Sequence, residues 1–221
     1  MKKIKYSEIT PEKIYNNRRS FIKSIGFSAS SLAITSLPFV NNALGKEQDQ
    51  LTSYKDITTY NNYYEFGTSK GDPYKNSQNF KTKPWEISIE GEVKKRIKWW
   101  MEEISNSFTS EERIFRLRCV EGWSMVIPWM GFSLSKLLSK VNPTSKAKFV
   151  AFESVYDPEQ MKGQRYPVLN WPYKEGLRID EAMHPLTTVV TGLYNKELPN
   201  QNGAPLRIFI PWKYGFKSAK A

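Results

Sequence analysis

The chain of 221 residues contains one cysteine, Cys119. A chain with one cysteine has no internal disulfide, so a packed hydrophobic core must hold its fold together. The thiol itself is a small buried apolar side chain, a catalytic nucleophile or a metal ligand. Arg116 and Arg118 precede it, and nearby positive charge favours the thiolate, the form that binds metals and attacks substrates. The local sequence leaves all three interpretations open.

Residues 1–43 are predicted to be an export signal rather than part of the fold. The paired arginines Arg18 and Arg19 are followed by Ser-Phe-Ile-Lys and then by an apolar stretch diluted with Ser and Thr. This pattern resembles a twin-arginine signal, which exports proteins already folded around a cofactor. Pro38 and the many hydroxyls make the stretch a poor membrane span. We therefore expect a periplasmic protein, exported by the twin-arginine machinery and cleaved near Ala43.

The charge of the chain favours an anionic ligand. The formal net charge is +11, and the seven positive and two negative charges of residues 1–43 leave +6 after processing. A moderate positive surplus is typical of a solvated basic surface, or of a surface that meets an anion or a phosphate. Nucleic acid is not an expected partner of an exported protein.

The apolar pattern of the mature chain predicts a β-rich α+β domain. Alternating or apolar runs predict strands over residues 85–93, 115–119, 148–156 and 206–211, of which 148–156 is apolar enough to be buried on both faces. Apolar residues at helical spacing over 134–141, followed by Asn142 and Pro143, predict a helix. We place a polar lead at residues 44–59 and the domain at residues 60–221.

Strand alternation limits what the two arginines can do. Phe115, Leu117 and Cys119 share one face of the predicted strand, and Arg116 and Arg118 lie on the other. The arginines therefore reach the sulfur only if the strand ends or bends at Cys119. The sequence also has a single histidine and lacks a glycine-rich phosphate loop, which argues against a multi-histidine zinc site and a nucleotide site.

Four separated blocks carry a family resemblance. They are residues 60–67 (YNNYYEFG), 118–125 (RCVEGWSM), 201–207 (QNGAPLR) and 211–217 (PWKYGFK). In this order they resemble the catalytic subunits of bacterial periplasmic methionine-sulfoxide reductases, molybdoenzymes of the sulfite-oxidase-like fold. The resemblance implies a β-rich, sulfite-oxidase-like molybdopterin-binding domain. Because family members continue for several strands beyond the last of these blocks, we expect this chain to lack C-terminal strands.

The resemblance also implies a cofactor and its ligands. Cys119 is expected to be the protein ligand of molybdenum in one molybdenum–molybdopterin per chain, since an anionic thiolate suits a high-valent metal. The residues implied to contact the pterin are Asn61, Tyr64, Glu65, Ser154, Asn202, Arg207, Ser218, Ala219 and Lys220. Ser154 stands where the family is expected to have threonine, and it keeps the hydroxyl. Arg207 and Lys220 suit the cofactor phosphate, because a guanidinium can bind it bidentately and an ammonium can neutralise it.

Asn62 and Glu121 are the candidates for the substrate side of the metal. Glu121 lies two residues beyond Cys119, so on a continuing strand it would share that face and could position or protonate the departing oxygen. The aromatic side chains of Tyr63, Trp123 and Trp129 are candidates for an accessible mouth, although core packing is their default role.

The implied reaction is the reduction of methionine sulfoxide in oxidised periplasmic proteins. The implied electron donor is a membrane haem-b subunit, because nothing in the sequence suggests a haem, flavin or iron–sulfur site of its own. Two alternatives stay open: sulfite-oxidase-type oxidation at the same cofactor, and an inactive, truncated binding domain.

Overall fold

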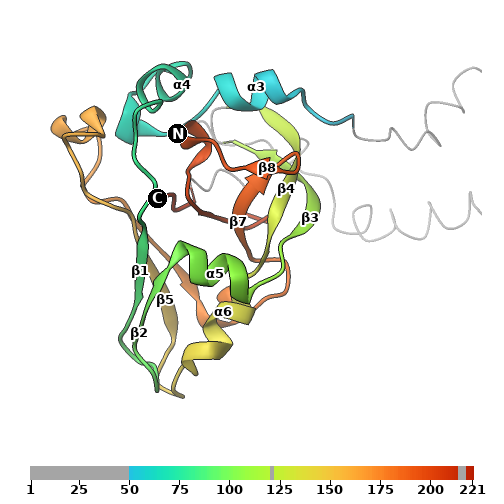
Figure 1. Cartoon of the computed structure of the whole chain (residues 1–221), viewed down its shortest axis with the longest axis vertical. Helices are drawn as coiled ribbons and strands as arrows, with labels where there is room; N and C mark the ends of the chain where they lie inside the picture. The colour runs from blue at the N-terminus through green and yellow to red at the C-terminus, as the bar shows by residue number, and fades with distance from the viewer. Residues whose placement is uncertain (1–49, 120–121, 214–217) are drawn as a thin grey trace, which may run out of the picture. The chain divides into compact units, whose positions relative to one another are not determined.

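The main sheet consists of one long hairpin and three further strands (Figure 1). The computed structural model describes residues 50–119, 122–213 and 218–221, and the predicted export signal lies outside them. Strand β3 (Glu111–Arg118) pairs antiparallel with β4 (Ser124–Ser133), and β4 pairs with β7 (Thr188–Leu193). β7 also pairs with β8 (Lys196–Glu197) and β9 (Arg207–Phe209).

Two small sheets and several short helices complete the described region. The small sheets are β1 (Glu86–Ile89) with β2 (Ile97–Trp100), and β5 (Phe149–Glu153) with β6 (Lys174–Arg178). The α-helices are α3 (Tyr54–Thr59), α4 (Asp72–Asn76), α5 (Met101–Ser107), α6 (Leu134–Val141) and α7 (Ile179–Ala182). The 3-10 turns are η2 (Tyr64–Phe66), η3 (Lys162–Arg165) and η4 (Asn200–Asn202). The β-rich α+β prediction is confirmed. No described helix has the length and apolar character needed to cross a bilayer.

Helix α6 has the bounds predicted from its apolar spacing. Leu134, Leu137, Leu138 and Val141 are all buried, and Asn142 ends the helix in the left-handed conformation with φ 50°. With α5, this helix covers one face of the main sheet and packs on side chains such as Phe132 (Figure 1). The core on this face therefore includes an amphipathic helix whose apolar stripe is evident in the local sequence.

The opposite face of the main sheet carries a second core and, as described below, the candidate site. On β4, Met125, Ile127 and Trp129 point to this face, where they pack with Leu193 of β7. A register shift at Met130/Gly131 accompanies the pairing of β4 with β7. Glycine is required there, because a Cβ at position 131 would lie 2.1 Å from the Val189 carbonyl oxygen.

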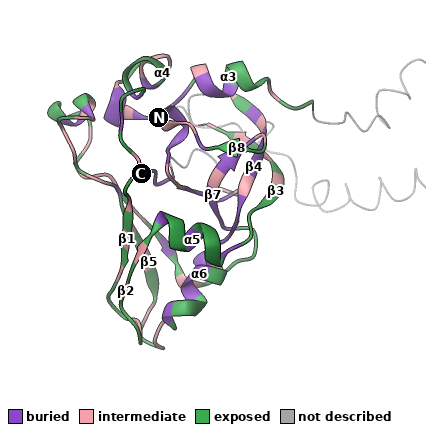
Figure 2. Ribbon diagram, viewed as in Figure 1, coloured by how far each residue is buried: buried purple, intermediate pink, exposed green. Residues whose placement is uncertain are grey.

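Two segments differ from the sequence-based expectation. Strand β5 was predicted to be buried on both faces, and this is wrong: Phe149 is 71% exposed, and β5 pairs with β6 alone among the described strands. Figure 2 shows exposed residues on β5 and on the β1–β2 hairpin, whereas β4 and β7 are largely buried. In the expected polar lead, residues 54–59 form α3, which buries Ile57 in the second core, and the Thr52 N–H donates to the Val126 carbonyl at 3.0 Å.

Candidate active site

Cys119 lies at the tip of the β3–β4 hairpin. β3 ends at Arg118, the Cys119 N–H donates to the Trp123 carbonyl at 2.9 Å, and the Gly122 N–H donates back to the Cys119 carbonyl at 3.1 Å. Gly122 has φ +83°, a conformation that favours glycine. The chain therefore turns directly after Cys119. Glu121, the candidate proton donor, lies outside the described residues, so its role stays a prediction.

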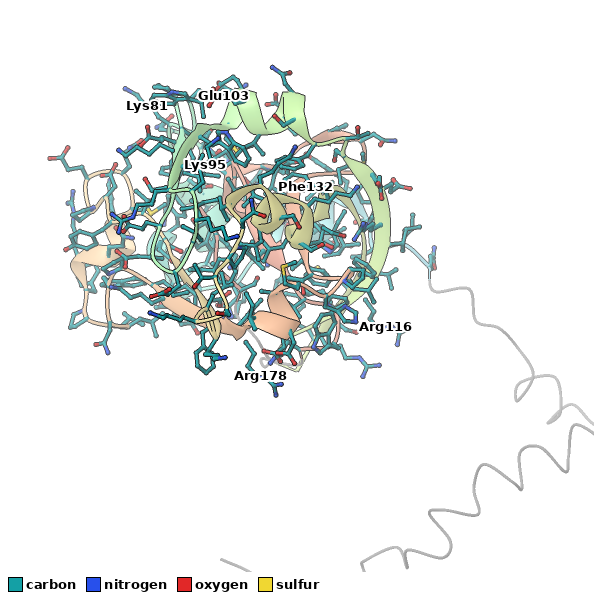
Figure 3. All side chains as sticks on the ribbon, turned by 90° about the horizontal axis from the view of Figure 1, so that it is seen from below. Lys81, Lys95, Glu103, Arg116, Phe132 and Arg178 are labelled. Carbon is teal, nitrogen blue, oxygen red and sulfur yellow. The ribbon has the colours of Figure 1, made fainter. Side chains whose placement is uncertain are left out.

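The hairpin places the thiol on its inner face. Phe115 and Leu117 are half-buried on this face, whereas Arg116 and Arg118 are exposed, as the alternation predicts. Arg116 lies on the outer side of the molecule, in contrast to the interior Phe132 (Figure 3). Arg118 also contributes to the rim of the pocket at Cys119. Cys119 is half-buried and lines the pocket.

One pocket brings together six of the residues implied by the family resemblance. They are Asn61, Asn62, Cys119, Asn202, Arg207 and Lys220. The hairpin adds Leu117, Trp123, Met125, Ile127 and Trp129, and the segments around α3 and η4 add Ile57, Tyr60 and Gln201. The pocket therefore joins four parts of the chain that are far apart in sequence.

Contacts of their side-chain amides position three asparagines of the pocket. The side-chain amides of Asn61 and Asn202 both donate to the Ile57 carbonyl, at 2.9 and 3.0 Å. The Asn62 amide nitrogen lies 3.9 Å from Cys119 Sγ, the length of a weak N–H···S hydrogen bond. The Oδ1 atoms of all three asparagines are buried and have no hydrogen-bond partner in the described part of the chain. Each asparagine thus keeps an acceptor for a group that enters the pocket.

Arg207 and Lys220 are two buried cations on neighbouring backbone segments. Both are 7% exposed, and they pair in an isolated antiparallel bridge. Arg207 donates from Nη1 to the Asn202 carbonyl at 3.1 Å and from Nη2 to Ser218 Oγ at 2.7 Å, and it lies 5.1 Å from the Trp129 ring centre. Its Nε has no partner among the described residues. Burial lowers the pKa of the Arg207 guanidinium to about 10. The site therefore contains a desolvated cation that would gain from an anion.

Acidic and phenolic groups interact with the segments that carry these cations. Ala219 N–H donates to Glu175 Oε1 at 2.6 Å, and Tyr173 OH donates to Glu175 Oε2 at 2.7 Å. Glu65 is 1% exposed. Burial, reinforced by the charge of Glu65, raises the pKa of Tyr63 well above its usual value, so its hydroxyl stays neutral. Glu175 thereby anchors the segment that presents Lys220.

The remaining predicted cofactor contacts do not line the pocket. Tyr64, Glu65, Ser154, Ser218 and Ala219 are not among its lining residues. Ser218 touches Arg207, and Ser154 has a buried hydroxyl without a partner among the described residues. The adjacent Val155 N–H donates to the Ala221 carbonyl at 2.8 Å, so Ser154 lies close to the C-terminal segment.

Of the three aromatic candidates, two line the pocket and one does not. Trp123 and Trp129 line the pocket, whereas Tyr63 is 1% exposed and packs on Phe66. Sequence reasoning did not single out Tyr60, Gln201 or Glu175 as site residues. Tyr60 lay within a recognised block, but Glu175 had no local signal because its contacts with Tyr173 and Ala219 are made by the fold.

Buried polar atoms without partners concentrate at this pocket. Among the described residues they are Asn61 Oδ1, Asn62 Oδ1, Tyr63 OH, Ser77 Oγ, Trp123 Nε1, Trp129 Nε1, Ser154 Oγ, Asn202 Oδ1 and Arg207 Nε. Most of them line the pocket or belong to residues implied to contact the pterin. Because burial without a hydrogen bond is costly, such a concentration is the signature of a binding site for a polar group. Among the described residues, no group of three or more His, Cys, Asp or Glu is arranged to hold a metal ion.

Comparison with known proteins identifies the family. Residues 74–221 match the oxidoreductase molybdopterin-binding domain family. The protein-methionine-sulfoxide reductase catalytic subunit MsrP of Pseudomonas syringae pv. tomato is 47% identical, with 98% of this chain and 73% of the relative covered. MsrP of Xanthomonas axonopodis pv. citri is 50% identical, with 97% of this chain and 71% of the relative covered. The chain belongs to the MsrP family. It is thus an oxidoreductase with a molybdopterin-binding domain, and the resemblance inferred from the four sequence blocks is confirmed.

The fold agrees with the family. The structure of the sulfane dehydrogenase SoxCD from Paracoccus pantotrophus superposes with a TM-score of 0.53 at 12% sequence identity. The match covers 96% of this chain and 58% of that chain. The described region is therefore the strand-rich, sulfite-oxidase-like domain that the MsrP family resemblance predicted.

Proposed function

We propose that this chain is the catalytic subunit of a molybdenum-dependent reductase that converts methionine sulfoxide residues of periplasmic proteins to methionine. The observation that carries the proposal is the pocket itself. It combines a half-buried thiol, Cys119, with two buried cations, Arg207 and Lys220, and a set of unpaired buried polar atoms. A cofactor with a sulfur-bound metal at one end and a phosphate at the other would suit the thiol, the cations and most of these polar atoms.

The residues present fit one molybdopterin per chain. Cys119 Sγ is the metal ligand in this proposal. Arg207 and Lys220 neutralise the phosphate, and Asn61, Asn202 and Ser154 offer hydrogen-bonding atoms to the pterin. Tyr64, Glu65, Ser218 and Ala219 stay proposed cofactor contacts, and Ser218 also accepts a hydrogen bond from Arg207. When bound, the cofactor would supply a molybdenum centre able to give the sulfoxide the two electrons that removal of its oxygen requires.

The protein's own groups orient and protonate the substrate. The Asn62 amide, 3.9 Å from the Cys119 sulfur, is placed to donate to an oxygen beside the metal site. Glu121 remains the proposed proton source, on the basis of its position two residues after Cys119. The overall reaction balances when a sulfoxide, two electrons and two protons give a thioether and water.

The partner and the location follow from the family. The relatives are named as catalytic subunits, which supports a separate electron-donating subunit, and we propose a membrane haem-b protein in this role. The paired arginines Arg18 and Arg19 support export by the twin-arginine machinery to the periplasm, where oxidised proteins are the substrates.

The test combines metal analysis with turnover. The exported protein should contain about one molybdenum per chain, and Cys119→Ser should lose both the metal and sulfoxide reduction while its fold is retained. Ser124→Ala is the matched control, because Ser124 is exposed on the same hairpin and lies on the opposite face. Metal-free wild type, or Cys119→Ser with wild-type activity, would refute the proposal. Sulfite oxidation faster than sulfoxide reduction would favour the oxidase alternative.

A further inference from the structure

We propose that the indole N–H of Trp123 and the ring of Tyr60 form the subsite that receives the methionine sulfoxide side chain. This inference rests on the proposed function and assigns the part of the pocket that contacts the substrate rather than the cofactor. Three observations support it: the position of Trp123 on the hairpin, the unpaired indole N–H of Trp123 and the exposure of Tyr60.

Trp123 is the cross-strand neighbour of Cys119. The last ladder pair of β3 and β4 joins Arg118 to Ser124, and the Cys119 N–H donates to the Trp123 carbonyl one step further along. Side chains of opposed residues in an antiparallel pair lie on the same face, about 5 Å apart at Cβ. The indole therefore lies beside the thiol, on the pocket side of the hairpin.

The Trp123 indole nitrogen is a buried donor without an acceptor among the described residues. An indole N–H cannot accept a hydrogen bond, so it needs an acceptor that enters the pocket. A sulfoxide oxygen is a strong acceptor, whereas the thioether of the product is a weak one. The same N–H therefore binds substrate better than product and favours release after reduction.

Tyr60 supplies the apolar part of the subsite. Its ring lies edge-on to Trp123 with centres 5.3 Å apart and planes at 79°, and Tyr60 is 45% exposed. Both rings line the pocket near Cys119, and Trp123 is half-buried. The methyl and methylene groups next to a sulfinyl sulfur pack favourably against aromatic rings, as thioethers do. A side chain from another protein can reach these rings because they are solvent-accessible.

Trp129, the second tryptophan that lines the pocket, has different surroundings. Trp129 also has an unpaired Nε1, but it is 1% exposed and stacks on the buried Arg207 guanidinium. Its location beside the buried cation places it with the cofactor phosphate, not with an arriving protein. The two tryptophans thus divide the pocket into an outer and an inner part.

The experiment compares Trp123→Phe with Trp99→Phe in the molybdenum-loaded enzyme. The first variant removes the N–H and keeps an aromatic ring. The second is a matched control, because Trp99 packs on Phe108 in the core on the other face of the main sheet. With a methionine-sulfoxide peptide as substrate, we expect Trp123→Phe to raise KM about fivefold, with kcat and molybdenum content near wild type. Trp99→Phe should change neither constant.

Each result decides the inference. An unchanged KM, or a loss of molybdenum in parallel with activity, overturns it, the latter by assigning the N–H to the cofactor. If Trp123→Phe does not fold, Tyr60→Leu decides in its place: a raised KM at full molybdenum content supports the subsite, and an unchanged KM refutes it. Wild-type enzyme in the same assay separates the two proposals, because a loaded wild type that does not reduce the peptide refutes the proposed function itself.

Discussion

Replacing Arg207 with methionine should separate cofactor binding from folding. Arg207 is 7% exposed, and burial lowers its pKa from 12.5 to about 10. At about 1.4 kcal/mol for each pKa unit, keeping this guanidinium charged in the folded chain costs about 3 kcal/mol. Methionine has a similar length and removes that cost, but it leaves the Asn202 carbonyl and Ser218 hydroxyl without their donor, which costs roughly 1–3 kcal/mol for each group.

These opposing contributions nearly cancel. From these two contributions we expect the free energy of unfolding of the cofactor-free Arg207→Met protein to stay within about 2 kcal/mol of wild type. Cofactor binding has no such compensation. Each charge-assisted hydrogen bond to a phosphate is worth roughly 1.5–3 kcal/mol, so loading should fall at least about tenfold.

The assay measures urea unfolding of the cofactor-free protein together with molybdenum and pterin per folded chain. Arg178→Met is the control, because Arg178 is an exposed arginine that pairs with Asp180 at 2.6 Å on the surface. Two outcomes would refute the reasoning. One is wild-type molybdenum content in Arg207→Met. The other is a stability loss well above 2 kcal/mol, which would mean that Arg207 mainly holds the fold.

Three further predictions concern the stability of the fold that positions the site. Leu138→Ala, at a position 4% exposed on α6, should cost roughly 3 kcal/mol in urea unfolding. Gly131→Ala should cost about 3 kcal/mol or prevent folding, because its Cβ would lie 2.1 Å from the Val189 carbonyl, whereas Gly71→Ala has open space and should be mild by the same measurement. Hydrogen bonds from Lys136 and then Arg113 lower the pKa of Glu111. Its stabilising contribution is therefore present above the unfolded-state pKa and lost as pH falls through the folded one, so the Tm difference between wild type and Glu111→Gln should shrink as the pH is lowered through the acidic range.

Local sequence patterns predicted the elements in which buried residues recur at the period of a helix or of a strand. The α6 helix, with Leu134, Leu137, Leu138 and Val141 on one face, matched its predicted bounds because the stripe and the following Asn-Pro are both local. The strand before Cys119 was found for the same reason. Helix α3 was missed because one apolar residue, Ile57, anchors it, and the partners of that residue come from distant strands.

The candidate site was predicted in part, and the missing part depends on tertiary contacts. Asn61, Cys119 and Arg207 were assigned through motif blocks, and the fold does bring them to one pocket. Glu121 lies outside the described residues, so the role expected for it stays a prediction. Glu175 could not have been found from the sequence, since its function as an anchor for Ala219 arises from a contact across 44 positions of the chain.

The arrangement of the sheet explains why thiol and cations share one pocket. Trp129 of β4 pairs with Leu193 of β7, and β7 in turn pairs with β9, whose first residue is Arg207. Alternation then puts Arg207 and Phe209 on the same sheet face as the inner face of the β3–β4 hairpin, where both contact Trp129. The isolated bridge between Arg207 and Lys220 brings the second cation to that face. A cation beside Cys119 would mainly stabilise a free thiolate; cations placed across the sheet instead suit a ligand that spans from the sulfur to a distant anionic end.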